Sequence, residues 1–221
     1  MLLYNRAPLK SAFPAGLFPW RLARGQRIGL LGGSFNPAHQ GHVDLSQQAM
    51  KRLKLDAVWW LVSPQNPLKT KNNISLATRM EQASLLVARC PYIKVMGVEE
   101  KIGSTYSARN LTLLCHLLPY TDFIWLMGAD NLAQLHRWRQ WPEIFSAVKL
   151  AVFARSPYAM KALHAPAARA FAHARCPYSQ LMGPAPRWSY ITMPENPLSS
   201  TYLRQQHKAT IFGTKNRGRL P

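Results

Sequence analysis

The stretch LLGGSFNPAHQGH, residues 30–42, places two glycines and two histidines directly after a short apolar run. The apolar residues within 27–32 are typical of a buried strand, and those within 42–54 recur at helical spacing. This part of the chain therefore predicts a strand, a glycine-rich turn and a helix. Gly32 and Gly33 would let the backbone turn sharply and pass close to a ligand.

The rest of the chain continues this alternation. Further strands are expected at 56–62, 92–97, 122–127, 149–153 and 188–192, and further helices at 75–89, 104–118, 129–145 and 199–207. We expect Ser75 to cap the helix at 75–89 and the helix at 129–145 to be interrupted near Pro142. The fold class that follows is α/β, a Rossmann-like doubly wound parallel sheet with helices on both faces. Residues 158–186 give no clear pattern.

Composition limits the class of protein. Hydrophobic residues make up 48% of the chain, and no apolar run approaches the roughly 20 residues of a membrane span, so we expect a folded protein without a membrane partner. Cys90, Cys115 and Cys176 lie far apart, which indicates neither a zinc site nor a disulfide framework. A reducing compartment fits this usage, and we expect a cytoplasmic location.

The chain is expected to divide into three parts. Residues 1–26 read as a basic leader, flexible, since they contain several prolines and no sustained apolar core of a secretory signal. A targeting peptide is the alternative for this part. Residues 27–208 form the folded domain, and residues 209–221 read as a flexible basic tail.

The net charge of +19 is unevenly distributed, because residues 144–221 contain eleven Lys and Arg but a single acid, Glu195. Such a field attracts polyanions, so nucleotides and nucleic acids are both candidate ligands. Charge alone does not choose between them. A basic RNA-binding protein is therefore an alternative of another class, although no dedicated nucleic-acid motif is found.

His39 and His42 are three residues apart at the predicted start of a helix. Ligands of open α/β sheets lie beyond the carboxyl ends of the strands, where helix N-termini attract anions. Both imidazoles could then face one phosphate group. An ordinary pair of surface histidines is the alternative. A zinc site would need a third ligand, and none is near in the sequence, so no protein metal site is expected.

The segment GSFNPAHQGH resembles the G-x-F-x-P-x-H-x-G-H signature of the nucleotidyltransferase superfamily that transfers AMP from ATP. Residues 199–204, SSTYLR, resemble its second signature, I-S-S-T-x-I-R, with Leu198 in place of the first isoleucine. The resemblance extends over most of residues 27–204 and is closest to bacterial nicotinate-nucleotide adenylyltransferases. It makes residues 27–208 the nucleotidyltransferase domain.

The resemblance also implies a set of site residues. The catalytic residues would be His39, His42 and Arg204, all holding ATP phosphates. The other residues expected to bind ATP are Gly32, Gly33, Ser34, Phe35, Lys69, Gly128, Asp130, Ser199, Ser200 and Thr201. The pyridine substrate would be held by Asn66, Tyr106, Ser107 and Trp138, with the Trp138 ring stacking on the base. Ser107 replaces the family's usual threonine. The alternative for Trp138 is a packing role in the core, and the alternative for Asp130 is that it only caps a helix.

The activity implied is transfer of AMP from ATP to nicotinate mononucleotide, giving nicotinate adenine dinucleotide and pyrophosphate in NAD biosynthesis. Mg²⁺ would accompany ATP, and no protein nucleophile is needed. Within the superfamily, nicotinamide mononucleotide and phosphopantetheine are the alternative acceptors. A fragment of a class I aminoacyl-tRNA synthetase is disfavoured, because no second lysine-rich signature is found. Homo-oligomers are left open.

Overall fold

The structure is a computed structural model and describes residues 23–63, 74–97, 104, 106–154 and 159–193. In this part of the chain the strands are β1 (Arg27–Gly33), β2 (Ala57–Val62), β3 (Ile93–Met96), β4 (Asp122–Gly128), β5 (Lys149–Ala154) and β6 (Trp188–Thr192). The α-helices are α1 (Gln40–Leu53), α2 (Leu76–Leu86), α4 (Ser107–Leu117), α5 (Ala129–Gln134), α6 (Trp141–Ala147), α7 (Ala159–Leu163) and α8 (Pro166–Ala170). The 3-10 turns are η1 (Leu135–Arg137), η2 (Ala172–Ala174) and η3 (Tyr178–Gln180).

The described strands form one six-stranded sheet in the order β3-β2-β1-β4-β5-β6. All neighbouring strands pair in parallel, with Leu30 of β1 opposite Trp59 of β2 and Trp125 of β4. The chain therefore starts in the middle of the sheet, builds outward to β3, returns to the other side of β1 and builds outward again. The predicted α/β fold with a doubly wound parallel sheet is confirmed.

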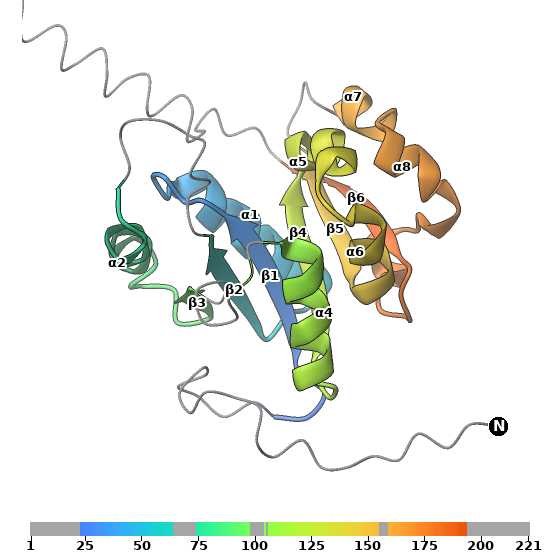
Figure 1. The fold of residues 1–221 in the computed structure, drawn as a ribbon. Coiled ribbons are helices and arrows are strands. Elements are labelled where there is room, and N and C mark those ends of the chain that lie inside the picture. Colours follow the sequence, from blue (N-terminus) through green and yellow to red (C-terminus); the bar gives the residue numbers. More distant parts are fainter. Residues whose placement is uncertain (1–22, 64–73, 98–103, 105, 155–158, 194–221) are drawn as a thin grey trace, which may run out of the picture.

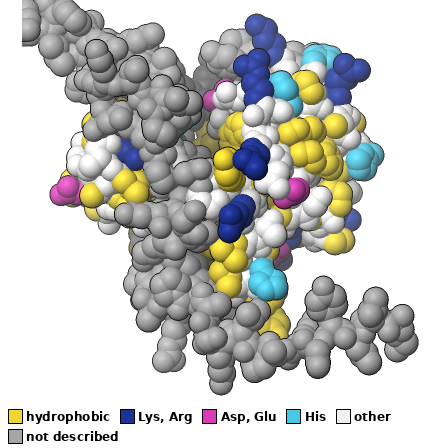
Figure 2. Space-filling view, viewed as in Figure 1, with side chains coloured by type: hydrophobic (Ala, Val, Ile, Leu, Met, Phe, Trp, Pro, Cys, Tyr) yellow, Lys and Arg dark blue, Asp and Glu magenta, His cyan; other side chains and the backbone are white. Residues whose placement is uncertain are grey.

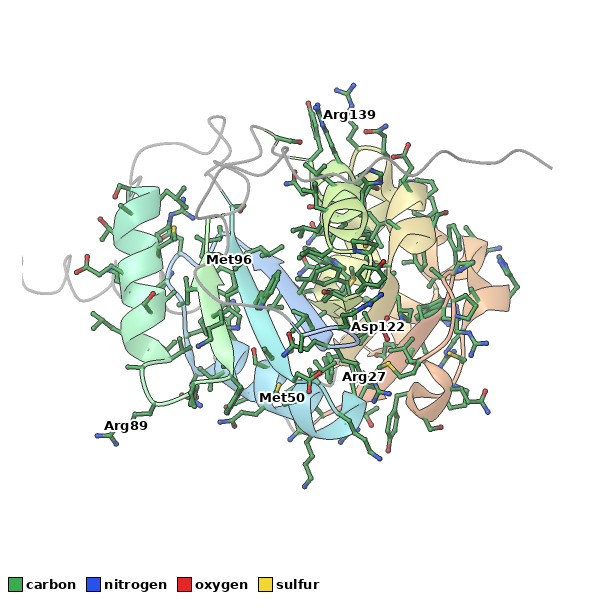
Figure 3. All side chains as sticks on the ribbon, turned by 90° about the horizontal axis from the view of Figure 1, so that it is seen from below. Arg27, Met50, Arg89, Met96, Asp122 and Arg139 are labelled. Atoms are coloured by element: carbon green, nitrogen blue, oxygen red, sulfur yellow. The ribbon has the colours of Figure 1, made fainter. Side chains whose placement is uncertain are left out.

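Helices cover both faces of the sheet (Figure 1), and the view along the sheet in Figure 3 shows the same layers. The helices α4 and α6 lie on one face, and α1 lies on the other. Two hydrophobic clusters fill the layers, one around Trp59, Trp125 and Leu111 and one around Trp60, Leu126 and Ala49. Because alternate residues of a strand point to opposite faces, the adjacent Trp59 and Trp60 belong to different clusters.

The boundaries of several helices differ from prediction for local reasons. The helix expected at 129–145 is interrupted near Pro142, as predicted, at residues 138–140, where Gln140 has φ +55°. Pro142 itself lies just after the break, in the first turn of α6, where a missing N–H costs no hydrogen bond. The unpatterned region 158–186 contains α7, α8, η2 and η3. The helix expected at 199–207 lies outside the described residues.

None of the described helices has both the length and the apolar character that a membrane crossing requires. Within the described ranges, Ser75 caps α2 as predicted, since its Oγ accepts a hydrogen bond from the N–H of Thr78 at 3.1 Å.

Candidate active site

The strand order places a topological switch point between β1 and β4. The connection after β1 leads through α1 toward β2, whereas the connection after β4 leads through α5 and α6 toward β5, on the opposite side of β4. The two connections therefore diverge at the carboxyl ends of two adjacent strands. Ligands of open α/β sheets bind at this kind of divergence. The predicted histidine turn follows β1, the predicted Gly128 is the last residue of β4, and the predicted Asp130 lies just beyond it.

The two glycines predicted to form the turn after β1 have a different role in the structure. Gly32 and Gly33 still belong to β1, and neither has a positive φ angle. A Cβ on Gly32 would run into the indole ring of Trp125, so the lack of a side chain there serves packing between β1 and β4. The left-handed residue of the turn is Phe35, with φ +46°. The sharp change of direction therefore comes after the two glycines.

The two predicted catalytic histidines cap α1 with their own side chains. His39 is the N-cap residue, and its Nδ1 accepts a hydrogen bond from the N–H of Gly41 at 3.1 Å. His42 is the third helical residue, and its Nδ1 accepts one from the N–H of His39 at 3.2 Å. This reciprocal pair is a capping box built from imidazoles, a role usually filled by Ser or Thr with Glu or Gln.

The capping box fixes the chemistry of both rings. Each Nδ1 accepts a hydrogen bond from a backbone N–H, so in its neutral form each imidazole carries its own proton on Nε2. The ring centroids lie 3.9 Å apart. Two N–H donors are thus held together at the N-terminus of a 14-residue helix, where the helix dipole favours an anion. The arrangement is suited to phosphate oxygens.

Behind the histidines lies a buried aromatic and polar support. The Phe35 ring stacks on Trp60 with centroids 4.9 Å apart and contacts His42 at 4.8 Å. The Trp60 Nε1–H donates to Ser46 Oγ at 2.9 Å, and the Ser46 hydroxyl donates to the His42 carbonyl oxygen at 2.8 Å. Phe35, Ser46 and Trp60 are all buried. The His42 ring is therefore held by its contact with Phe35, and the His42 backbone by its hydrogen bond with Ser46.

Arg79 on α2 contacts the turn after β1, and the sequence prediction did not include it. Its side chain is buried at 1% exposure and donates to the carbonyl oxygens of Ser34 and Ser63, the latter at 2.8 Å. The sequence did contain a signal. Leu76, Met80 and Ala83 mark the inward face of α2, and Arg79 lies on that same face. A cation at such a position requires partners inside the protein.

The direct passage from β4 into α5 brings Gly128 and Asp130 together. Gly128 is the N-cap residue of α5 and has no side chain to cap it, and Asp130 is the acid of the first helical turn. The Asp130 carboxylate folds back so far that a Cβ on Gly128 would meet its Oδ1. Asp130 is exposed and offers a carboxylate at the carboxyl end of β4.

The residues predicted for the pyridine site come from two neighbouring segments. Tyr106 is the N-cap residue of α4, exposed at 42%, and Ser107 is the first helical residue. The Tyr106 hydroxyl accepts a hydrogen bond from Arg139 Nη1 at 3.2 Å, and the same guanidinium lies 4.8 Å from the ring centroid. Trp138, next to Arg139, is half-buried against the core cluster around Trp125. Figure 3 shows the Arg139 side chain pointing outward at the edge of the molecule.

Several predicted residues lie outside the described part of the chain. These are Asn66, Lys69, Ser199, Ser200, Thr201 and Arg204. Their roles stay predictions. The described residues that the fold gathers at the carboxyl ends of β1 and β4 are Gly32, Gly33, Ser34, Phe35, His39, His42, Gly128 and Asp130.

Basic side chains extend over the face that carries α4 to α8 (Figure 2). The exposed cations on these helices and their connections include Arg109, Arg137, Arg139, Lys161 and Arg169. The positive field predicted from the sequence is therefore present on the described surface, and it favours approach of polyanionic substrates.

Comparison with known proteins agrees with this geometry. The cytidylyltransferase-like family model matches residues 30–206, which include the histidine turn, the β4–α5 junction and the second predicted motif. The doubly wound sheet and the histidine-capped helix at its divergence thus define a nucleotidyltransferase.

The relatives narrow the family further. Proteins named probable nicotinate-nucleotide adenylyltransferase are 45% identical in Roseobacter denitrificans, over 82% of this chain and 93% of that protein, and 49% identical in Caulobacter sp., over 80% and 96%. The chain belongs to the nicotinate-nucleotide adenylyltransferase family. A Plasmodium falciparum nicotinic acid mononucleotide adenylyltransferase complexed with NaAD shares the fold, with a TM-score of 0.61 at 14% identity, over 81% of this chain and 83% of that one.

Proposed function

We propose that this protein transfers AMP from ATP to nicotinate mononucleotide, giving nicotinate adenine dinucleotide and pyrophosphate, in NAD biosynthesis. The observation that carries the proposal is the imidazole capping box, which holds two Nε2–H donors together at a helix N-terminus. The names of the relatives support the choice of acceptor.

The reaction needs no nucleophile from the protein. A phosphate oxygen of nicotinate mononucleotide attacks the α-phosphorus of ATP, and the bond from that phosphorus to the bridging oxygen of pyrophosphate breaks in line. Negative charge moves from the attacking oxygen to the leaving group. Catalysis then consists of positioning two anions and stabilising the charge where it develops.

His39 and His42 would serve that electrostatic role. The two rings lie side by side, with centroids 3.9 Å apart, so their donors could contact adjacent phosphate groups and follow the charge as the bond breaks. Since both Nδ1 atoms are engaged by backbone N–H groups, neither ring needs to reorient during the reaction. Donors held in place before the reaction stabilise a transition state more effectively than mobile ones.

The acceptor would bind on the β4 side of the switch point. Tyr106, Ser107 and Trp138 lie on α4 and on the segment between η1 and α6, which pack on the same face of the sheet. An aromatic surface with hydroxyl groups can stack on a pyridine ring and hydrogen-bond its carboxylate. Arg204, Lys69, Asn66 and the residues of the second motif complete the proposed site.

We further propose that ATP is used as its Mg²⁺ complex. Mg²⁺ keeps several water ligands and binds phosphate oxygens, so it needs few protein ligands. The exposed Asp130 carboxylate at the start of α5 could contact the ion through water. Bound Mg²⁺ would neutralise charge on the departing pyrophosphate.

The experiment is a pyrophosphate-release assay with ATP and Mg²⁺, in which nicotinate mononucleotide, nicotinamide mononucleotide and phosphopantetheine are compared as acceptors. The expected result is the highest kcat/KM with nicotinate mononucleotide, complete loss of activity with EDTA and its recovery on adding Mg²⁺. A higher kcat/KM with either other acceptor contradicts the proposed substrate. Absence of pyrophosphate with all three contradicts the proposed reaction.

A further inference from the structure

Arg79 is the largest charged side chain in the buried core of the described structure. It lies on α2 with 1% of its surface exposed. Within the described ranges the ion pair found is between Lys149 and Asp122, at the opposite edge of the sheet, and no carboxylate meets Arg79. An arginine buried without an acid is costly unless carbonyl groups satisfy it. Because burying this cation is costly, we look for a role of Arg79 beyond packing.

Among the described residues, three backbone carbonyls accept hydrogen bonds from the Arg79 guanidinium. Nη1 donates to the Ser34 and Ser63 oxygens, and Nε donates to the Ile74 oxygen at 3.3 Å. These carbonyls come from the turn after β1, from the residue after β2 and from the residue before the N-cap of α2. The N–H of Ser63 also donates to the Gly33 oxygen at 2.9 Å. The ends of β1 and β2 and the start of α2 are therefore tied together at one cation.

The hydrogen bond from Arg79 to the Ser34 carbonyl oxygen determines the direction of the next backbone N–H, that of Phe35. The Ser34–Phe35 peptide is not among the cis bonds, and in a trans peptide the C=O and the N–H point in opposite directions. With the carbonyl directed at Arg79, the Phe35 N–H is directed away from the guanidinium. It lies on the side of the turn opposite α2, in the segment that leads from β1 to the histidine cap.

The buried charge also changes the strength of that amide. Burial lowers the pKa of the Arg79 guanidinium, because desolvation disfavours its charged form, and the carbonyl contacts offset part of that cost. A cation at a carbonyl oxygen in a low-dielectric interior polarises the whole peptide group, which makes its N–H a stronger donor. The effect needs the guanidinium and not merely a side chain that fills the space.

We propose that Arg79 is a positioning residue for ATP, which orients and polarises the Ser34–Phe35 peptide so that the Phe35 N–H donates to an ATP phosphate oxygen. The inference rests on the proposed function, because the turn must be a phosphate site. Arg79 itself does not touch ATP. It acts through the peptide that lies between it and the ligand.

The test compares variants that separate support of the turn from support of α2. Arg79→Lys keeps the charge but lacks the planar fork that reaches several carbonyls at once. Arg79→Ala leaves a cavity that methylguanidinium can enter. Ser75→Ala is the matched control, because it removes the N-cap hydrogen bond of the same helix without contacting the turn. For each variant kcat, KM for ATP, KM for nicotinate mononucleotide and Tm are measured.

The expected result is a fall in kcat of about 10-fold to 100-fold in Arg79→Lys, the size of one lost charge-assisted hydrogen bond. The KM for nicotinate mononucleotide should stay within about twofold, a change too small to represent a lost hydrogen bond. Millimolar methylguanidinium should restore kcat in Arg79→Ala, and Ser75→Ala should lower Tm while keeping the wild-type kcat.

The inference is overturned if Arg79→Lys keeps the wild-type kcat, or if Ser75→Ala loses as much kcat as Arg79→Lys. If Arg79→Ala does not fold, the comparison of Arg79→Lys with Ser75→Ala decides alone. Failure of the proposed function is a separate result, because it leaves the wild-type protein without pyrophosphate release. If Arg79 has no positioning role, the wild-type protein still releases pyrophosphate, and only the variants give the contradicting result.

Discussion

The imidazole of His42 accepts the backbone N–H of His39 at 3.2 Å, while the imidazole of His39 accepts the N–H of Gly41 at 3.1 Å. The same two side chains therefore cap the helix and, in the proposed reaction, would donate to the phosphate oxygens. Stability and catalysis would then be coupled at this point, and substitutions can separate them.

Replacing His42 tests its catalytic role. We expect His42→Ala to lower kcat by about 10-fold to 100-fold, the size of one strong hydrogen bond made in the transition state, with a much smaller rise in the KM for ATP. Steady-state kinetics of pyrophosphate release measure both. His116→Ala, at an exposed position on α4, is the control and should keep full activity. Equal and small changes in kcat and KM would contradict the assignment.

Two substitutions of His39 separate capping from catalysis. His39→Asn retains a good N-cap oxygen, so its free energy of unfolding should stay close to that of the wild type. His39→Ala should lose about 1 kcal/mol, the usual cost of a missing N-cap. Both variants should lose most of their kcat. Urea denaturation and kinetics test this, and an active His39→Asn would show that the imidazole serves only as a cap.

Neighbouring glycines should respond differently to the same substitution. A methyl group on Gly32 meets the Trp125 ring, whereas one on Gly33 has its nearest neighbour, a carbon of Phe35, at an ordinary 3.5 Å. We expect Gly32→Ala to destabilise the fold by about 1 to 3 kcal/mol through overpacking, and Gly33→Ala to cost much less. Thermal denaturation of the two variants makes the comparison. Similar losses of stability in both would rule out the ring of Trp125 as the cause.

The thiol of Cys115 gives a prediction on pH. Burial raises its pKa from the ordinary value near 9 to about 11. Because the folded state keeps the proton that the unfolded state loses, this group should contribute stability that is fully present below about pH 9 and is lost as the pH rises to about 11. Cys115→Ala should lose less stability over this interval than the wild type. Urea denaturation from pH 8 upward tests it, and parallel curves would contradict it.

Removing the Tyr106 hydroxyl tests the acceptor side. Tyr106→Phe keeps the ring but releases Arg139 from its 3.2 Å hydrogen bond. We expect the KM for nicotinate mononucleotide to rise about threefold to tenfold, the size of one neutral hydrogen bond, with the KM for ATP unchanged. Arg137→Gln is a control at a nearby exposed cation. A change confined to the KM for ATP would contradict the prediction that Tyr106 contacts the acceptor.

The main features of the fold could be predicted because they depend on local pattern. Apolar runs such as 57–62 and the helical spacing after His42 specify their own secondary structure, and alternation of the two specifies a parallel sheet. The two histidines could be placed at a helix start for the same reason. The predicted ends of the helices are less accurate. The interruption expected near Pro142 is present at residues 138–140, but the pattern did not show that Pro142 itself lies in the first turn of the next helix, since proline suits a first turn as well as an interruption.

The parts that could not be predicted depend on contacts between distant residues. Gly32 needs its lack of a side chain because of Trp125, and that neighbour is set by the pairing of β1 with β4. The partners of Arg79 are backbone carbonyls, which no side-chain pattern reveals. The contacts of Gly32 and Arg79 therefore require the tertiary structure, whereas the tautomers of His39 and His42 follow from the local geometry of the helix cap.

The divergence of connections between β1 and β4 has a consequence for how such an enzyme can change. In the proposed site the two histidines that would bind phosphate groups come from α1 and its N-cap, on one half of the sheet, while Tyr106 and Trp138, which would bind the acceptor, come from segments packed on the other half. Substitutions on the acceptor half need not disturb the histidine cap or its buried support. The two halves can therefore diverge separately in evolution, so that a new acceptor can be acquired while the machinery for ATP is inherited unchanged.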